Sequence, residues 1–274
     1  MKKQRVDVLL VKQGLFSSRE RAKRAVMAGE ILGKNEQRID KPGTKIAPDT
    51  HLHFKGKRMP YVSRGGLKLA KALNVFKISV AGLTVLDVGS STGGFTDVML
   101  QHGAKRSYAL DVGTNQLVWK LRKDPRVIVM EHTNFRYSKP DDFKHGQPEF
   151  ASIDVSFISL RLILPPLKPI LKPGGEVVAL IKPQFEAERN QVGKHGIVKS
   201  HAVHAQVIRR VIGYALRSGF AVLGLDFSPI EGGKGNVEFL IHLKSVANPQ
   251  VAPQLSIQDV LTKARRSFKI KRKG

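Results

Sequence analysis

The sequence has 274 residues, of which 47 are basic and 22 acidic, and its formal net charge at pH 7 is +25. This length and a hydrophobic fraction of 41% suit one large domain with a small one and exclude disorder throughout. The absence of cysteine excludes a disulfide framework, a thiolate metal site and a cysteine nucleophile. Apolar runs are far shorter than a membrane span, and the basic start lacks a secretory apolar core, so we expect a cytoplasmic protein.

The basic excess is concentrated at the two ends of the chain. Residues 1–60 hold 15 basic and six acidic side chains, and residues 255–274 hold seven basic side chains against Asp259 alone. A charge of this size favours a polyanionic partner, bound through its phosphates, over a merely basic surface. The pattern predicts a nucleic-acid-binding module in front, a larger body and a basic tail.

The first 55 residues predict a small module of two helices followed by short strands. A helix is expected over 5–13, and the pattern Ser17-Ser-Arg-Glu20 predicts the capped start of a second helix that runs to about Ala28. Short strands are expected around residues 31–32, 45–46 and 51–54, between turn residues.

The run 17–31 resembles the α-L RNA-binding motif of the small-subunit ribosomal protein S-four type. The resemblance implies that this module binds and positions RNA without doing chemistry, and the competing interpretation is a solvated basic helix face. The RNA-binding candidates are Arg5, Arg19, Arg21, Lys23 and Arg24.

The segment 84–97 carries the strongest signal in the chain. An apolar, β-branched strand with Asp87 near its end leads into the small-residue loop 89–94 and then into a helix near Phe95, which is the first βα turn of a doubly wound sheet. The loop has neither the glycine pattern of a dinucleotide site nor the Gly-Lys-Ser/Thr of a phosphate loop. Its glycines are expected to let the backbone approach a ligand closely.

A second acid follows at the distance expected for an adenosyl ribose. Asp111 ends the next predicted strand, about 20 residues after the loop, where it can accept both ribose hydroxyls, and Asn134 follows the strand after that. An adenosine without a pyrophosphate points to S-adenosylmethionine. The cofactor-binding candidates are Asp87, Gly89, Ser90, Ser91, Thr92, Gly93, Gly94, Phe95, Asp111 and Asn134.

Two later strands end in charged residues. A strand that starts at Phe150 ends in Asp154, one that starts at Gly175 ends in Lys182, and a final hairpin is expected over 220–225 and 237–242 after a helix over 200–218. Chemistry in such sheets gathers beyond the carboxyl ends of the strands. A lysine at the end of so apolar a run is expected either to have a function or to form a plain ion pair. Glu238 lies within its predicted strand, where an inward carboxylate would need a partner.

The whole chain resembles the TlyA family, the haemolysin-like rRNA 2′-O-methyltransferases, whose catalytic domain is similar to that of the FtsJ/RrmJ ribose methyltransferases. The matching pieces are residues 61–69, 87–97, 153–159, 181–186 and 232–238. The resemblance implies catalytic residues Lys68, Asp154, Lys182 and Glu238, with S-adenosylmethionine as cofactor and ribosomal RNA in the ribosomal subunits as partner. The basic end after about residue 255 lies outside it, but Ile257, Val260, Leu261 and Ala264 fall on one side of a short helix there, which we expect to dock and to leave its basic residues for RNA.

The expected fold is α/β, a Rossmann-like class I methyltransferase sheet flanked by helices, with a small α+β RNA-binding domain at the N-terminus. We expect an S-four-type domain over 1–58, a linker over 59–62, an FtsJ/RrmJ-like domain over 63–248 and a basic C-terminal tail over 249–274.

The expected reaction is an in-line displacement in which alignment supplies much of the rate. Lys182 is the candidate base or hydroxyl-orienting group, since burial and a neighbouring cation can make a lysine a base, and Lys68 is the candidate neighbour. Asp154 and Glu238 would hold the two ammonium groups. No metal is expected, because the three histidines between 195 and 204 fit no zinc spacing.

Three other functions compete with this one. A membrane lysin, which the family's name suggests, would have to use the basic tail, since no obligatory membrane segment is visible. A non-catalytic protein that binds S-adenosylmethionine and RNA would not need the four charged residues. A pseudouridine synthase often carries the same front module but not this cofactor loop. The sequence names neither the target nucleotide, nor the subunit, nor the oligomeric state.

Overall fold

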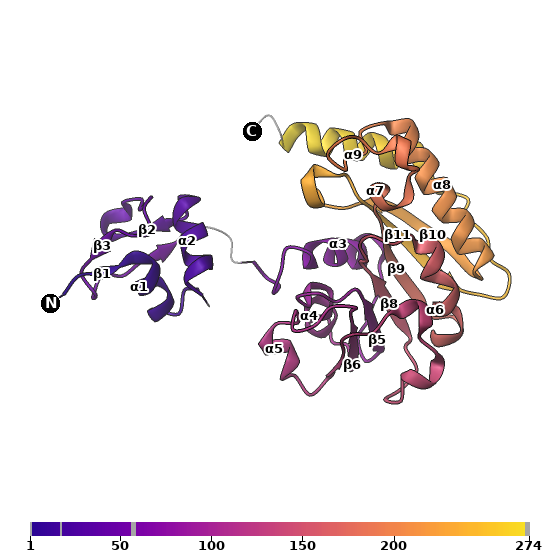
Figure 1. The fold of residues 1–274 in the computed structure, drawn as a ribbon, viewed down its shortest axis with the longest axis horizontal. Coiled ribbons are helices and arrows are strands. Elements are labelled where there is room, and N and C mark those ends of the chain that lie inside the picture. The colour runs from indigo at the N-terminus through magenta and orange to yellow at the C-terminus, as the bar shows by residue number, and fades with distance from the viewer. Residues whose placement is uncertain (1, 17, 56–58, 272–274) are drawn as a thin grey trace. The chain divides into compact units, whose positions relative to one another are not determined.

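The computed structural model describes residues 2–16, 18–55 and 59–271, with side chains up to Phe268. The chain divides into two compact units, Met1–Pro60 and Tyr61–Gly274 (Figure 1). Each has a hydrophobic core of its own.

The first unit packs two short helices against two small antiparallel ladders. Helices α1 (Val6–Lys12) and α2 (Arg19–Met27) contact each other. Strand β1 (Gln4–Arg5) pairs with β3 (Lys45–Ile46), and β2 (Ile31–Leu32) pairs with β4 (His53–Phe54). A 3₁₀ turn, η1 (Lys34–Glu36), follows β2. The core consists of Val6, Leu9, Leu10, Ala22, Ala25, Val26, Ile31 and Leu52.

The start of α2 differs in detail from the expected capping box. Ser18 is the N-cap and accepts a hydrogen bond from the backbone N–H of Arg21 at 3.4 Å. Glu20 forms an ion pair with Lys23, one turn further along the helix, at 2.8 Å. Ser17, the first residue of the expected box, lies outside the described residues.

A buried carboxylate joins the two helices of this unit. Asp7 has a fully buried side chain and accepts hydrogen bonds from Arg5 at 3.0 Å and from Arg19 at 3.1 Å. The Arg5 guanidinium, helped by Arg19, holds the pKa of Asp7 below its usual range. Two of the expected RNA-binding arginines therefore also fix the packing of α1 against the start of α2.

Replacing Asp7 by asparagine is expected to lower the free energy of unfolding of the first unit by about 1.5–3 kcal/mol, because charge-assisted hydrogen bonds are lost at a buried site. The lowered pKa adds stability that is present at neutral pH and is lost as the pH falls below about 4. Hydrogen exchange of the α1 amides in the full chain at pH 7 measures this, with the exposed Asp49→Asn as control. Equal protection in the two variants would contradict the role of Asp7.

The second unit is built on a seven-stranded sheet in the order β10-β11-β9-β8-β5-β6-β7. The strands are β5 (Thr84–Val88), β6 (Arg106–Leu110), β7 (Val127–Met130), β8 (Phe150–Ile153), β9 (Glu176–Ile181), β10 (Phe220–Phe227) and β11 (Phe239–Ser245). Strands β5 to β9 pair in parallel, while β11 runs antiparallel to both β9 and β10. The strand order reverses at β5. From β5 the chain adds β6 and β7 on one side, and it then continues with β8 and β9 on the other side.

Helices cover both faces of this sheet (Figure 1). The helices are α3 (Gly66–Phe76), α4 (Gly94–Gln101), α5 (Trp119–Arg122), α6 (Leu164–Ile170), α7 (Pro183–Glu186), α8 (His201–Arg217) and α9 (Ile257–Lys271). Short 3₁₀ turns are η2 (Phe135–Tyr137), η3 (Pro140–Asp142), η4 (Leu160–Leu162), η5 (Arg189–Gln191) and η6 (Gly233–Gly235). One core includes residues of α3 and α4, a larger one residues of α6, α8 and α9, and a small cluster residues of α4 and α5. Adjacent residues of one strand enter different cores, as with Val85 and Leu86, since strand side chains alternate between faces.

This arrangement confirms the predicted α/β fold, with two differences in the last third of the chain. Glu238 precedes β11 instead of lying within it. The expected docked helix is present as α9, with Val260, Leu261 and Ala264 buried against the core under α8, so the second unit extends past the expected domain end at residue 248. Residues 272–274 lie outside the described part.

Candidate active site

The four charged residues expected to act together come from four different elements. Asp154 follows β8 directly and Lys182 follows β9 directly, so both lie at the edge where the parallel strands end. Glu238 reaches the same edge from the opposite direction, because β11 is antiparallel to β9 and Phe239 pairs with Ile181. Lys68 is supplied by α3, which precedes the first strand of the sheet.

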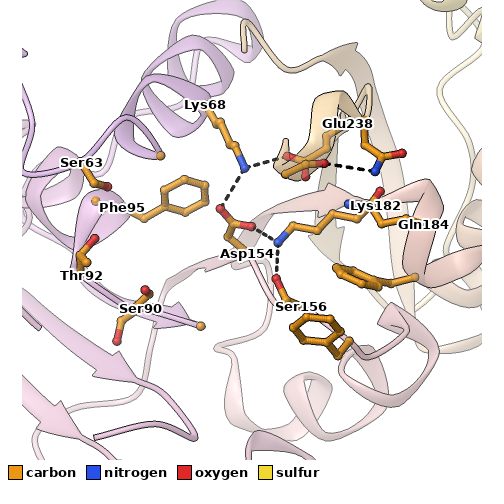
Figure 2. A pocket seen from close by; sticks show the side chains of 18 of the residues that line it. Ser63, Lys68, Ser90, Thr92, Phe95, Asp154, Ser156, Lys182, Gln184 and Glu238 are labelled. Atoms are coloured by element: carbon orange, nitrogen blue, oxygen red, sulfur yellow. Dashed lines mark hydrogen bonds and ion pairs between the residues drawn. The ribbon is translucent and has the colours of Figure 1, made fainter. Parts of the chain in front are cut away.

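Their side chains form one continuous ionic cluster (Figure 2). The Lys182 Nζ lies 2.6 Å from Asp154 Oδ1 and donates a hydrogen bond to Ser156 Oγ at 3.0 Å. The Lys68 Nζ lies 3.4 Å from the other oxygen of Asp154 and 2.7 Å from Glu238 Oε2. Asp154 thus bridges the two ammonium groups.

The cluster is buried and its formal charges cancel. The side chain of Glu238 is 2% exposed, those of Lys182 and Lys68 about a tenth, and that of Asp154 18%. Burial acts to lower the pKa of Lys68, but the attraction of Asp154 and Glu238 outweighs it and raises this pKa above its usual value. Lys68 is therefore a permanent cation at neutral pH. Burying these ion pairs costs desolvation energy, so a functional role explains the cluster better than a contribution to stability does.

The loop after β5 forms the opposite wall of the site. Gly89 and Gly93 have φ angles of +87° and +91°, which side chains rarely adopt. A Cβ atom at Gly89 would lie 2.8 Å from the carbonyl oxygen of Asp154, and one at Gly93 would lie 2.3 Å from Leu121. These glycines are thus required by the approach of other parts of the chain, whereas the sequence alone suggested the approach of a ligand.

Asp87 holds this loop from inside the core. Its carboxylate is fully buried and accepts hydrogen bonds from the N–H and the hydroxyl of Thr96, at 2.9 and 2.7 Å, and from the Ser152 hydroxyl at 3.1 Å. Asp87 therefore fixes the start of α4 against β8 and does not line the cavity.

Burial raises the pKa of Asp87 to about 7, despite the hydrogen bonds from Thr96 and Ser152. The stability that depends on this group is fully present below its unfolded-state pKa of about 4 and is lost as the pH rises to about 7. We expect the unfolding temperature of the wild type to fall, relative to that of Asp87→Asn, between about pH 4.5 and 7 and then to level off. Calorimetry of both proteins measures this difference, and a constant difference would contradict the shift.

Asp111 and Asn134 lie beside the loop. Asp111 accepts hydrogen bonds from the backbone N–H groups of Ser91 and Gly113, each at 2.8 Å, which orients its carboxylate at the end of β6. The Asn134 side chain accepts from the N–H of Arg136 at 3.2 Å and caps η2.

The cluster and the loop enclose a cavity of about 540 Å³, a volume in the range of small-molecule and cofactor sites. The expected residues that line it are Lys68, Gly89, Ser90, Ser91, Thr92, Gly94, Phe95, Asp154, Lys182 and Glu238. Asn134 lines an adjoining hollow of about 600 Å³, while Gly93 and Asp111 line neither. Within the described part of the chain, no three histidine or acidic side chains converge as metal ligands.

Sequence reasoning about single residues missed the aromatic pair at the mouth of the site. Phe157 and Phe185 contact each other at 4.9 Å between ring centroids and line both hollows. Phe157 is 90% exposed and has a φ of +63°, which is uncommon for a bulky residue. Both residues lie in the family-like runs 153–159 and 181–186, next to the catalytic candidates, and that position was the available signal.

Asn236 is a further missed residue, and it joins two loops over the cavity. It is 2% exposed, accepts from the N–H of Val198 at 3.0 Å and donates to the carbonyl of Gly196 at 2.8 Å. The glycine-containing segments around residues 196 and 233 are thereby held together as one wall.

The residues present fit S-adenosylmethionine. The cavity has an oriented carboxylate beside it at Asp111, polar loop residues on one side and the ionic cluster on the other. The φ of +46° at Ser91 directs its N–H to Asp111, and the hollow lined by Asn134 continues the space. A site for an adenosine-bearing ligand without a phosphate-binding loop is consistent with this chemistry.

In the first unit, the five expected RNA-binding residues are distributed unevenly. Arg5 and Arg19 pair with Asp7, and Lys23 pairs with Glu20. Arg21 and Arg24 lie exposed on α2.

Comparisons with known proteins agree with this geometry. A family model described as FtsJ-like methyltransferase matches residues 61–245. YqxC of Bacillus subtilis (strain 168), provisionally named an rRNA methyltransferase, is 58% identical over 260 residues, which cover 95% of this chain and 92% of that protein. The "16S/23S rRNA (cytidine-2'-O)-methyltransferase TlyA" of Mycobacterium tuberculosis (strain ATCC 25618 / H37Rv) is 40% identical, over 88% of this chain and 90% of its own.

A solved structure gives the same result in three dimensions. The provisionally named hemolysin from Streptococcus thermophilus superposes with a TM-score of 0.81 at 58% sequence identity and covers both chains completely. The similarity extends over both units and includes the strands that carry the ionic cluster. The chain belongs to the FtsJ-like methyltransferase family.

Proposed function

We propose that this protein transfers a methyl group from S-adenosylmethionine to a ribose 2′-hydroxyl of ribosomal RNA. The observation that carries the proposal is the buried Lys68–Asp154–Lys182–Glu238 cluster, which faces a cofactor-sized cavity at the carboxyl edge of the sheet. The similarity to the M. tuberculosis protein, which is named as an rRNA (cytidine-2'-O)-methyltransferase, supports the same reaction and substrate.

When bound, S-adenosylmethionine supplies an electrophilic methyl group. The protein has to align a ribose hydroxyl with that methyl group and to remove the proton of the hydroxyl. Lys182 is the group for this step, because its Nζ is fixed at the end of β9 by Asp154 and Ser156. A neutral Lys182 accepts the hydroxyl proton, and a charged one orients the hydroxyl oxygen.

Lys68 and Glu238 act on this step through Asp154. The cationic Lys68 lies across the Asp154 carboxylate from Lys182, so that Asp154 is held between the two side chains. Glu238 balances the charge of Lys68.

The first unit supplies affinity for the RNA in this proposal. The exposed basic face of α2, with Arg21 and Arg24, suits phosphate contacts, as expected of an S-four-type module. We assign residues 1–58 to RNA binding and residues 63–248 to catalysis, joined over 59–62.

Methyl-labelled S-adenosylmethionine, incubated with undermethylated small subunits, large subunits and whole ribosomes, tests the proposal. Label at a ribose 2′-oxygen of rRNA with the wild type, and none with Lys182→Ala, is the expected result, and it names the subunit. Binding of the cofactor without label on any substrate would contradict it.

A lytic protein is the competing function, and a leakage assay separates the two. No helix in the described part of the chain is long and apolar enough to cross a bilayer. Purified protein is expected to release no dye from anionic vesicles at concentrations that saturate methylation.

A further inference from the structure

A second cavity, of about 680 Å³, lies on the other side of the wall that encloses the active site. It is bounded by the segments 197–204 and 234–239 and by α9. Asn236 forms the partition, since its hydrogen bonds tie the segment around Val198 to the loop that contains η6. Lys234, with a φ of +60°, lines both cavities.

The floor of this cavity is apolar and its rim is cationic. The floor consists of Val237, Phe239, Leu261, Ala264 and Phe268, and the rings of Phe239 and Phe268 are themselves buried in the core. The exposed side chains of Lys199, His201, Lys234 and Arg265 stand at the rim. Burial lowers the pKa of His204, which donates its Nε2 hydrogen bond to the carbonyl of Val198 and stays neutral.

The charge at the rim is not balanced inside the cavity. No acidic residue is among the described residues that line it, and Lys199, Lys234 and Arg265 have no ion pair within that same part of the chain. Three cations over an apolar floor suit a ligand that is anionic on one side and apolar on the other. A nucleotide of single-stranded RNA has this combination, with a phosphate for the rim and a base for the floor.

We propose that this cavity, the α8–α9 pocket, binds a nucleotide of the RNA strand next to the one whose ribose enters the active site. The inference rests on the proposed function, because the active-site cavity then holds the target nucleotide of the same strand. Lys234 is the shared element: its ammonium group neutralises the phosphate between the two nucleotides, and Lys199 and Arg265 neutralise the next one.

The test compares two double variants that remove the same charge. Lys199→Ala/Arg265→Ala removes two rim cations, whereas Lys263→Ala/Arg266→Ala removes two exposed cations of α9 that do not line the pocket. Affinity of the full chain for a fluorescent single-stranded RNA oligonucleotide of mixed sequence is measured by anisotropy over a series of salt concentrations. The first variant is expected to bind about tenfold more weakly and to lose roughly 0.7 from the slope of log affinity against log salt, because one phosphate contact is lost, and the control much less.

Photo-crosslinking then locates the RNA. An oligonucleotide that contains 4-thiouridine is expected to label the peptide over 257–268 in the wild type, and less in Lys199→Ala/Arg265→Ala. Equal affinities and slopes for the two double variants, or no label on this peptide, would overturn the proposal. Loss of binding to phosphatidylglycerol vesicles with unchanged RNA affinity would assign the pocket to a membrane surface instead and also overturn it.

These measurements do not depend on methyl transfer. If no rRNA is methylated but the pocket still binds RNA as described, the proposed function fails and the pocket stands. If transfer occurs and the rim variant keeps the wild-type KM for ribosomal subunits, the pocket fails and the proposed function stands.

Discussion

Replacing Lys182 by alanine is expected to lower the single-turnover rate of methyl transfer by at least about a hundredfold, because a positioned proton acceptor typically contributes a factor of 10² to 10⁴. The affinity for S-adenosylmethionine is expected to stay within about threefold of the wild type. Lys182 faces Asp154 and Ser156 across the cavity from the loop that follows β5, so its loss leaves the cofactor side of the site intact. Rapid-quench transfer assays and calorimetric titration with the cofactor measure the two quantities.

A matched control is available at the opposite edge of the sheet. Lys172 pairs with Glu149 at 3.1 Å and is exposed, and Lys172→Ala should transfer methyl groups at the wild-type rate. Lys182→Arg separates the two roles of the side chain, because arginine keeps the charge but does not release a proton at neutral pH. Substantial activity in this variant would assign Lys182 to orientation, and near-normal activity of Lys182→Ala would remove it from the mechanism.

Replacing Asp154 by asparagine is expected to abolish transfer to a similar degree and, in contrast to Lys182→Ala, to destabilise the fold as well. The variant removes the carboxylate that both Lys68 and Lys182 contact and leaves two ammonium groups facing one amide. Removing one partner from a buried ion pair costs about 3–5 kcal/mol, and the 18% exposure of Asp154 places this case at the lower end. Denaturant unfolding and single-turnover assays of the full chain measure both effects.

The control for this variant is another carboxylate on the same sheet. Asp226 is 14% exposed, pairs with Lys71 at 3.0 Å and does not line the active-site cavity. Asp226→Asn should lose comparable stability while its transfer rate stays normal. If the activity of Asp154→Asn falls only in proportion to its fraction of unfolded protein, then Asp154 has a structural role alone.

The two variants together divide the ionic cluster into its parts. Lys182 is expected to affect the rate without the fold, and Asp154 to affect both, because one side chain is at the end of the cluster and the other is its bridge. Lys68 and Glu238, whose charged atoms lie 2.7 Å apart, complete a formally neutral set that can lose water when RNA closes the cavity.

The sequence by itself determined the features that depend on neighbouring residues. A parallel strand that ends in a charged or glycine-rich loop places that loop at one edge of a sheet, so Asp154, Lys182 and the segment 89–94 could be assigned to a common edge before the structure was known. The continuously apolar strands and the long amphipathic helix over 200–218 were predicted for the same reason, because a local hydrophobic pattern reports burial.

Only the tertiary structure decided which distant groups meet. Lys68 is separated from Asp154 by 86 residues, and α3 has to pack over the sheet before the two can touch. No local pattern shows that Asp7 is buried between Arg5 and Arg19, that a Cβ atom at Gly89 would strike the backbone of Asp154, or that Asn236 divides two cavities. These contacts are fixed by the packing of segments far apart in the chain, and their energies depend on burial, which a single sequence window does not contain.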